Sequence, residues 1–280
     1  MDSPTTQQAE PKFTRQSTAL GLPPLGQYLA EAWRYRTFAI YWSKADIKAR
    51  NFENLLGRVW HMLNPLLFGG GGLGSTERLA FIVGNLYVWG FFSGAVSTGA
   101  GSIQGGAGGV MAQSAIPRVI MPFASTLTST ELFLRSLIAY VPLHILSGRG
   151  LHIEMLWLPY LTLITGVFGF GLAMLFAVGN VYVRDVSRLL PHALRLWLYL
   201  SPAIWEYTTV LSASTLDTLA RVNPMYSGMA AWTIAFGGNL DPSGPGILSL
   251  LATFTIWALA VGLIGFFVFV SREDDFAVRN

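Results

Sequence analysis

The sequence predicts an all-α integral membrane protein with six transmembrane helices, of which the first is short. Hydrophobic residues make up 52% of the 280 residues and charged residues only 12%, about half the charged fraction of a typical soluble domain. Several apolar tracts reach the roughly 20 residues that an α-helix needs to cross ~30 Å of hydrocarbon. In lipid, a helix satisfies its backbone N–H and C=O groups within the segment itself. We expect spans near 59–73, 80–100, 122–147, 155–181, 188–210 and 247–270.

The first of these spans decides the topology. At ~1.5 Å per residue it covers only about 22 Å, which is less than the hydrocarbon core. It also contains Asn64, Pro65 and a run of glycines at 69–72. If it did not cross, the two termini would lie on opposite sides of the membrane, against the charge distribution.

The basic residues are distributed asymmetrically between the loops. Most of the 18 Lys and Arg residues fall in the N-terminal segment, in alternate loops and in the C-terminal tail, whereas Arg78, Arg149 and Arg221 fall in the intervening loops. Because cytoplasmic loops carry the excess of Lys and Arg, this pattern predicts that both termini are cytoplasmic. The basic excess is therefore a topology signal, and we expect no nucleic-acid partner.

Two segments flank or interrupt the spans at the N-terminal end. Residues 1–26 are polar and rich in Pro, Thr and Gln, which predicts a disordered cytoplasmic tail. Residues 27–55 mix aromatic residues with Arg34 and Arg36 at helical spacing, which is typical of an amphipathic helix lying at the membrane interface. An ordinary amphipathic helix packed on a partner is the alternative. Residues 27–280 then form one transmembrane domain.

A further apolar segment lies between the fifth and sixth spans. Residues 211–245 are polar at both ends and apolar from Met225 to Phe236. This apolar stretch is too short to cross the bilayer. We expect a re-entrant segment on the external side.

Residues that could support enzymatic chemistry are scarce. The chain has no cysteine, and its four histidines lack the spacing of metal ligands, so we expect no metal site. The glycine run before Ser75 lacks the lysine of a phosphate-binding loop. Gly166, Gly169 and Gly171 lie inside a span, where close helix packing explains them better than a dinucleotide. An intramembrane glycosyltransferase would need acidic residues in a loop, and Asp185 beside Arg184 is the one candidate. We therefore expect that this chain does not hydrolyse ATP by itself.

Charged residues inside the spans are more informative. Glu131 and Arg135 lie one helical turn apart near the middle of the third span, where each costs about 2.5–3.5 kcal/mol on insertion scales. An i,i+4 pair offsets part of this cost. Two interpretations stay open: a structural ion pair that locks two helices, or a polar strip along a hydrated conduit. Arg195 lies closer to the cytoplasmic side, where its side chain can snorkel to the interface.

Aromatic residues also have two interpretations. Trp and Tyr commonly form belts at the two membrane interfaces. Alternatively, aromatic rings line a path on which sugar rings stack, because a ring offers an apolar face with a polar tip. The residues that could line such a path, together with the charged pair Glu131 and Arg135, are Tyr87, Trp89, Phe92, Trp205, Tyr207 and Tyr226.

Six short motifs occur in order between the expected spans. They are Asp46-x-Lys48-x-Arg50, Leu56-Gly57-x-x-Trp60-x-x-Leu63-x-Pro65, Ile116-Pro117-Arg118-x-x-x-Pro122, Asn180-x-x-x-Arg184-Asp185-Val186, Leu200-Ser201-Pro202-Ala-x-Trp205 and Asn223-Pro224-Met225. Together, over residues 27–272, they resemble the permease subunit of ABC-2 type exporters of cell-surface polysaccharides, the Wzm-type partner of Wzt-type ATPases. The sequence of residues 85–92 and 95–99 looks most like that of the galactan exporters of mycolic-acid-bearing bacteria.

This resemblance implies that the chain is a transport subunit and not an enzyme, and it implies a set of partners. It implies a homodimer of this chain, bound to two ATPase subunits in a 2+2 complex in the bacterial plasma (inner) membrane. The cargo would be a lipid-diphosphate-linked polysaccharide of galactan or O-antigen type, exported from the cytoplasm. ATP and Mg²⁺ would bind the partner subunit, so no cofactor is expected in this chain. An ABC-2 permease for another cargo, such as a teichoic acid or a drug, is the alternative.

The resemblance also implies roles for particular residues. Arg34 and Arg36 would capture the diphosphate at the headgroup level, since a guanidinium binds phosphate bidentately. The residues expected to couple the permease to the ATPase are Asp46, Lys48, Arg50, Pro117, Arg118, Arg184 and Asp185.

Overall fold

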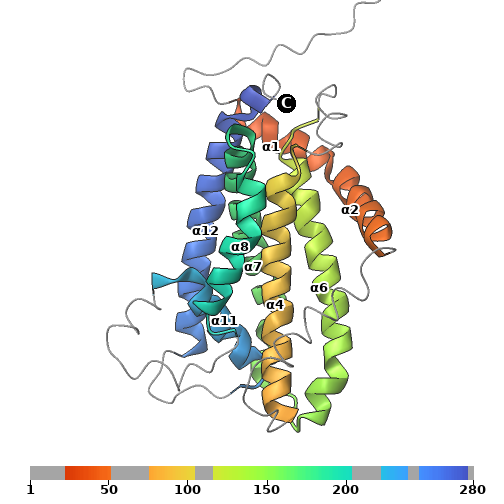
Figure 1. Cartoon of the computed structure of the whole chain (residues 1–280), viewed down its shortest axis with the longest axis vertical. Coiled ribbons are helices and arrows are strands. Elements are labelled where there is room, and N and C mark those ends of the chain that lie inside the picture. Colours follow the sequence, from red (N-terminus) through yellow and green to blue (C-terminus); the bar gives the residue numbers. More distant parts are fainter. Residues whose placement is uncertain (1–22, 52–75, 105–115, 204–221, 239–245, 277–280) are drawn as a thin grey trace, which may run out of the picture.

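The structure is a computed structural model, and it describes residues 23–51, 76–104, 116–203, 222–238 and 246–276. These residues form helices and turns, and no strand occurs among them. This confirms the all-α prediction for the described part of the chain. Four long helices form the body of the bundle (Figure 1): α4 (Thr76–Gly101), α6 (Ile120–Leu146), α7 (Leu158–Tyr182) and α12 (Ile247–Ser271).

The long helices coincide with the spans expected near 80–100, 122–147, 155–181 and 247–270. In the described residues, three helical segments are long and apolar enough to cross a membrane: α4, α12, and α7 together with the preceding 3₁₀ helix η1 (Ile153–Trp157). Helix α6, with 27 residues, is long enough but is not among these three, because its sequence contains Ser, Thr, Glu and Arg. The predicted first span, 59–73, lies outside the described residues.

Helices α4, α7 and α12 run in one direction and α6 runs in the opposite direction, which brings distant segments to the same end of the bundle. The end of α4, the start of α6, the end of α7 and the end of α12 lie together near the top of Figure 1. We call this the C-terminal end. The described parts of the two predicted cytoplasmic loops and of the C-terminal tail, namely 101–104 with 116–121, 180–188 and 271–276, lie there.

Four shorter helices complete the described structure. Helix α8 is 14 residues long and covers about 21 Å, so it fills only part of the span expected at 188–210. Helix α11 occupies the apolar segment after Asn223 and packs against α4, α7 and α12. The bounds are α1 (Leu25–Arg34), α2 (Arg36–Asn51), α8 (Val186–Tyr199) and α11 (Pro224–Ala235).

The segment predicted as one interface helix, 27–55, forms two helices as far as Asn51. The break falls at Tyr35, between α1 and α2. The Arg36 guanidinium donates to the Trp33 carbonyl at 3.0 Å and lies 4.8 Å from the Trp33 ring centroid. This side chain therefore binds a carbonyl at the end of α1 and supports the change of direction.

Helix α2 then packs along α6. Its Ala39 belongs to a small cluster with Ile120 and Ala124 of α6, and the Thr128 hydroxyl donates to Ser43 Oγ at 3.1 Å. The contacts advance together along both helices, so this part of α2 follows the course of α6 and does not cross it. Figure 1 shows α2 beside the upper half of α6.

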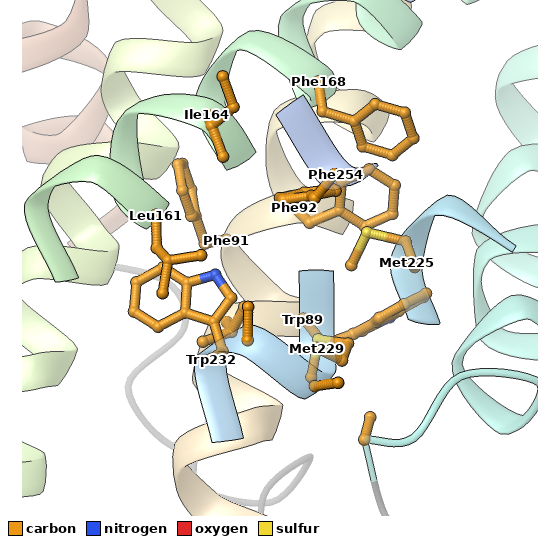
Figure 2. Packing of buried hydrophobic residues seen from close by; sticks show 14 of the residues in the cluster. Trp89, Phe91, Phe92, Leu161, Ile164, Phe168, Met225, Met229, Trp232 and Phe254 are labelled. Atoms are coloured by element: carbon orange, nitrogen blue, oxygen red, sulfur yellow. The ribbon is translucent and has the colours of Figure 1, made fainter. Parts of the chain in front are cut away.

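Aromatic packing forms the core between α4, α6, α7, α11 and α12. Figure 2 shows the rings of α4 and α7 meeting those of α11 and α12. Phe92 stacks on Phe168 with ring centroids 5.5 Å apart, and Trp232 meets Phe133 edge-on at 5.4 Å. The Trp232 indole N–H donates to Thr165 Oγ1 at 3.1 Å, so this buried polar group is paired.

Glycines allow α7 to approach its neighbours closely. A Cβ added at Gly171 would lie 2.7 Å from Gly262 Cα in α12, and one added at Gly169 would lie 3.2 Å from Ala95 Cβ in α4. Small residues let helix backbones meet in this way. These contacts confirm the prediction of close helix packing for Gly169 and Gly171, whereas a Cβ added at Gly166 would make only an ordinary contact, 3.6 Å from Phe91 Cζ.

Candidate transport face and coupling end

The exposed faces of the long helices differ in chemistry. Between Ile256 and Val268 of α12, every exposed side chain is apolar, as expected of a surface that meets lipid tails. Helices α8, α4 and α6 lie across another side of the bundle, with α4 in contact with both of the others (Figure 1). Exposed charged or ionisable residues do occur within α6 and α8, among exposed apolar residues such as Leu134 and Leu196; they are Arg135 on α6, and Arg188, His192 and Arg195 on α8. We call the exposed surface of α6 around Glu131 and Arg135 the charged face.

The charged pair of α6 lies deep in the helix and remains exposed. Arg135 Nη2 and Glu131 Oε1 are 2.5 Å apart, and their side chains are 54% and 34% exposed, respectively. Arg135 is about 16 Å from the nearer end of α6, at ~1.5 Å per residue. The pair joins two residues of a single helix. Within the described residues it therefore neutralises charge on one helix surface and does not lock α6 to another helix.

Helix α8 packs through an apolar stripe and exposes its other side. Leu190 and Leu194 are buried against the bundle, whereas Arg195 is exposed two turns from the start of the helix. Arg188 forms an exposed ion pair with Asp185 at 3.5 Å. An exposed pair of this kind adds little stability, so its charges remain accessible to a partner.

Most of the described aromatic residues predicted for a substrate path lie inside the bundle. Trp89, Phe92 and Tyr226 are 6%, 0% and 2% exposed, and Tyr87 is partly buried. Trp89 and Phe92 both meet the Trp197 ring edge-on, at 6.3 and 5.4 Å. These rings form part of the wall that joins α4 to α8. The path assignment itself stays a prediction, and Trp205 and Tyr207 lie outside the described residues.

Two of the sequence motifs meet at Asn223. Its Oδ1 accepts hydrogen bonds from the Trp197 indole N–H at 2.8 Å and from the Met225 N–H at 3.0 Å, which caps α11. Its Nδ2 donates to the Leu200 carbonyl at 3.2 Å and to Ser201 Oγ at 3.1 Å. One amide side chain thus ties the end of α8 to the start of α11.

A second asparagine organises the C-terminal end. Asn180 is buried near the end of α7, and its Nδ2 donates to the Ala100 carbonyl of α4 at 3.2 Å. Its Oδ1 accepts from the Ser187 N–H at 3.2 Å. This arrangement fixes the turn that carries Arg184 and Asp185, and both of these predicted coupling residues are exposed.

The other predicted site residues divide between this end and the later part of α2. Pro117 is buried and Arg118 is half-buried. Arg34 and Arg36 are exposed on either side of the Tyr35 break. Lys48 is exposed on α2 and Asp46 is half-buried, and Arg50 is also part of this helix. The structure therefore gathers Arg118 with the Arg184–Asp185 turn at one end, and it places Asp46 and Lys48 further along α2.

Sequence reasoning missed one residue of this end, Glu273. Its carboxylate accepts a hydrogen bond from the Arg118 backbone N–H at 2.8 Å. In the sequence Glu273 is one of three consecutive acids after Arg272, a pattern typical of charged, solvent-exposed residues that end a transmembrane span. Nothing in that pattern distinguishes the buried Glu273 from the partly exposed Asp275.

Together these features define a helical membrane protein with a charged face and a polar, hydrogen-bonded end. Among the described residues, no three His, Asp or Glu side chains gather where they could hold a metal ion.

Sequence comparison then gives the class. The chain is 25% identical to the O-antigen export system permease protein RfbA of Myxococcus xanthus, over 88% of this chain and 96% of the relative. Two proteins of Klebsiella pneumoniae with the same name are 22% and 21% identical, over 70% and 68% of this chain and 79% and 76% of their own lengths. No family model matches. The comparisons confirm the resemblance to Wzm-type permeases, and with it a transport subunit of the membrane and not an enzyme. They carry no information about galactan.

Proposed function

We propose that this protein is the permease subunit of an ATP-driven exporter that moves a lipid-diphosphate-linked polysaccharide, of galactan or O-antigen type, across the bacterial inner membrane. The similarity to O-antigen export permeases over most of the chain supports the polysaccharide cargo and the ATPase partner. In this proposal two copies of the chain face each other in the membrane, and two ATPase subunits bind on the cytoplasmic side and supply the energy for export.

The observation that carries this proposal is the Glu131–Arg135 pair on an exposed part of α6. At this depth lipid penalises each charge by about 2.5–3.5 kcal/mol, and Arg135 is too far from either end to snorkel out easily. Such a surface suits water or protein. If a second copy faces it, the two charged faces enclose a hydrated path, whereas the apolar face of α12 meets lipid.

The finer topology belongs to the same proposal. It has six spans, including 59–73, with α11 as the re-entrant segment and both termini cytoplasmic. The C-terminal end of the bundle then faces the ATPases. Pro117, Arg118, Arg184 and Asp185 lie there, which suits their proposed role in coupling. Asp46, Lys48 and Arg50 lie on the part of α2 that continues along α6 away from this end, and they are assigned to coupling from the resemblance alone.

Diphosphate capture is assigned to the exposed Arg34 and Arg36. The guanidinium of Arg36 already lies over the Trp33 ring, and Trp33 is itself exposed. An aromatic side chain beside basic groups is typical of a surface at the lipid headgroups.

The residues proposed for the substrate path would have two different roles. Glu131, Arg135 and Tyr87 are at least partly exposed and would border the cargo directly. Trp89, Phe92 and Tyr226 would support the wall, with Trp205 and Tyr207 assigned from the sequence alone.

The motor is expected to be a separate chain. An affinity-tagged copy of this protein, purified in mild detergent from its source bacterium, should carry a nucleotide-binding subunit and hydrolyse ATP. The protein purified alone should not hydrolyse ATP, since no phosphate-binding loop is present in the sequence. An unrelated multi-span protein with the same tag is the control. Hydrolysis by the lone chain, or repeated purification without an ATPase, would refute the proposal.

The charged pair provides a direct test of the path. The double variant Glu131→Gln and Arg135→Gln removes both charges while keeping polar side chains of similar size. Because the pair is exposed and joins one helix only, we expect assembly to persist and export to fall at least about tenfold, a loss of ~1.4 kcal/mol. Export is measured as labelled surface polysaccharide in cells depleted of the chromosomal copy.

The conservative variant Glu154→Gln, in η1 at the other end of the bundle, is the matched control. Unchanged export in the double variant would show that the pair faces lipid or a static interface. Analysis of the glycan that accumulates inside depleted cells distinguishes a galactan or O-antigen from a teichoic acid. Absence of any accumulated polymer would favour a drug.

A further inference from the structure

The short 3₁₀ helix η2 (Glu273–Asp275) contacts two segments that are far apart in the sequence. The first contact is with residues 116–121. The Glu273 carboxylate accepts from the Arg118 N–H at 2.8 Å, and the Glu273 carbonyl accepts from Arg118 Nη1 at 3.3 Å. Glu273 is only 3% exposed. A charge-assisted hydrogen bond to a buried carboxylate is strong, because water does not compete for it.

The second contact is with the end of α7. The Tyr182 hydroxyl donates to Asp275 Oδ2 at 2.6 Å, and Arg272 Nη1 lies 3.4 Å from the same hydroxyl oxygen and 3.8 Å from Asp275 Oδ2. Tyr182 comes two residues before Arg184 in the turn that Asn180 fixes. Arg118 and Arg184 therefore belong to segments that bind successive parts of one turn.

Apolar packing holds η2 firmly on the last long helix. Phe276 is buried, and its ring meets Phe269 of α12 edge-on at 5.2 Å. The Arg118 guanidinium lies 5.9 Å from the Phe276 ring centroid. Movement of Phe276 relative to α12 would disturb its contacts with Phe269 and Arg118. Helix α12 in turn meets α7 at Gly171.

We propose that η2 is a positioning element for energy coupling, in which Glu273 and Asp275 make the two coupling segments move as one body with α12. This inference rests on the proposed function and deepens it. A push from the ATPases on residues 116–121 and on the 180–188 turn would reach α12 through η2, and through Gly171 it would reach α7. Glu273 is the principal residue, because it is buried and holds Arg118 from both its carboxylate and its backbone carbonyl.

The test uses the complete complex of this chain with its ATPase. Glu273→Ala removes the acceptor for the Arg118 N–H, and Tyr182→Phe removes the hydroxyl that donates to Asp275 while keeping the ring. Ser271→Ala is the matched control at the same end, because the Ser271 hydroxyl donates only within α12, to the Val268 carbonyl. Three quantities are measured: the ATPase that co-purifies, the ATP hydrolysed by the purified complex, and the labelled polysaccharide that reaches the surface of depleted cells.

We expect the combined Glu273→Ala and Tyr182→Phe variant to keep its ATPase and its hydrolysis rate within about twofold of the wild type. Export per ATP should fall about tenfold, within the range typical of coupling between two sites. Unchanged export per ATP overturns the inference. A parallel loss of thermal stability, assembly, hydrolysis and export also overturns it, because η2 would then be a structural support only. Failure of the wild type to retain an ATPase would instead refute the proposed function.

Discussion

Replacing Gly171 by alanine should destabilise the bundle by about 1–3 kcal/mol, the usual range for overpacking a tight contact. The added Cβ would lie 2.7 Å from Gly262 Cα and 2.8 Å from Gly262 N, whereas non-bonded carbon atoms prefer about 3.5–4.0 Å. Both neighbouring atoms belong to the backbone, so no side chain can turn away. Relief requires α12 to move from α7.

A second glycine separates packing from helix propensity. A Cβ added at Gly90 of α4 would meet nothing within 4 Å. Gly90→Ala should therefore gain up to about 1 kcal/mol from helix propensity alone. The measurement is the midpoint of thermal aggregation in detergent for the wild type and both variants. Equal midpoints for Gly171→Ala and Gly90→Ala would contradict the close contact of α7 with α12.

Asn223→Ala should cost about 2–4 kcal/mol and should loosen α8 from α11. The substitution removes the cap of α11, which contributes about 0.5–2 kcal/mol. It also leaves the partly buried Trp197 indole N–H without its acceptor, which costs about 1–3 kcal/mol. The readout is denaturant or thermal unfolding of the purified chain, followed by Trp fluorescence.

A double-mutant cycle identifies the contact responsible. Trp197→Phe keeps an aromatic ring but removes the indole N–H that Asn223 accepts. If this hydrogen bond carries much of the loss, Asn223→Ala will cost less in the Trp197→Phe background than in the wild type. Strictly additive effects of the two substitutions would show that the hydrogen bond contributes nothing.

The long helices could be predicted from the sequence because their length follows directly from the length of an apolar run. The ends of α4, α6, α7 and α12 lie within a few residues of the expected bounds. The break at Tyr35 could not be predicted in this way, since no Gly or Pro marks it. At the break the Arg36 side chain binds the Trp33 carbonyl, and the local sequence does not predict this contact.

The candidate site was predictable in type but less so in orientation. The depth of Glu131 and Arg135 follows from their place in the span, and their exposure agrees with one of the two interpretations that the sequence left open. For Trp89 and Phe92, the sequence shows that a helix is aromatic but not which side packs inward. Burial of these rings depends on α7, α8 and their Phe168 and Trp197 side chains, far away in the sequence.

The same limit applies to the acids after α12. Glu273 and Asp275 differ in burial because the backbone turns between them, and only the position of Arg118 and Tyr182 gives each its partner. Asn180 and Asn223 were present in recognisable motifs, and the structure adds the reason: each amide joins two helices.

The hydrogen bonds of Asn223 limit which residue can occupy this position. Its Oδ1 accepts two hydrogen bonds and its Nδ2 donates two, so both ends of the amide are used. An ionised aspartate would offer no donor to the Leu200 carbonyl, and leucine, of similar size, would offer neither a donor nor an acceptor. Related proteins that keep the connection between α8 and α11 should therefore keep an amide side chain here.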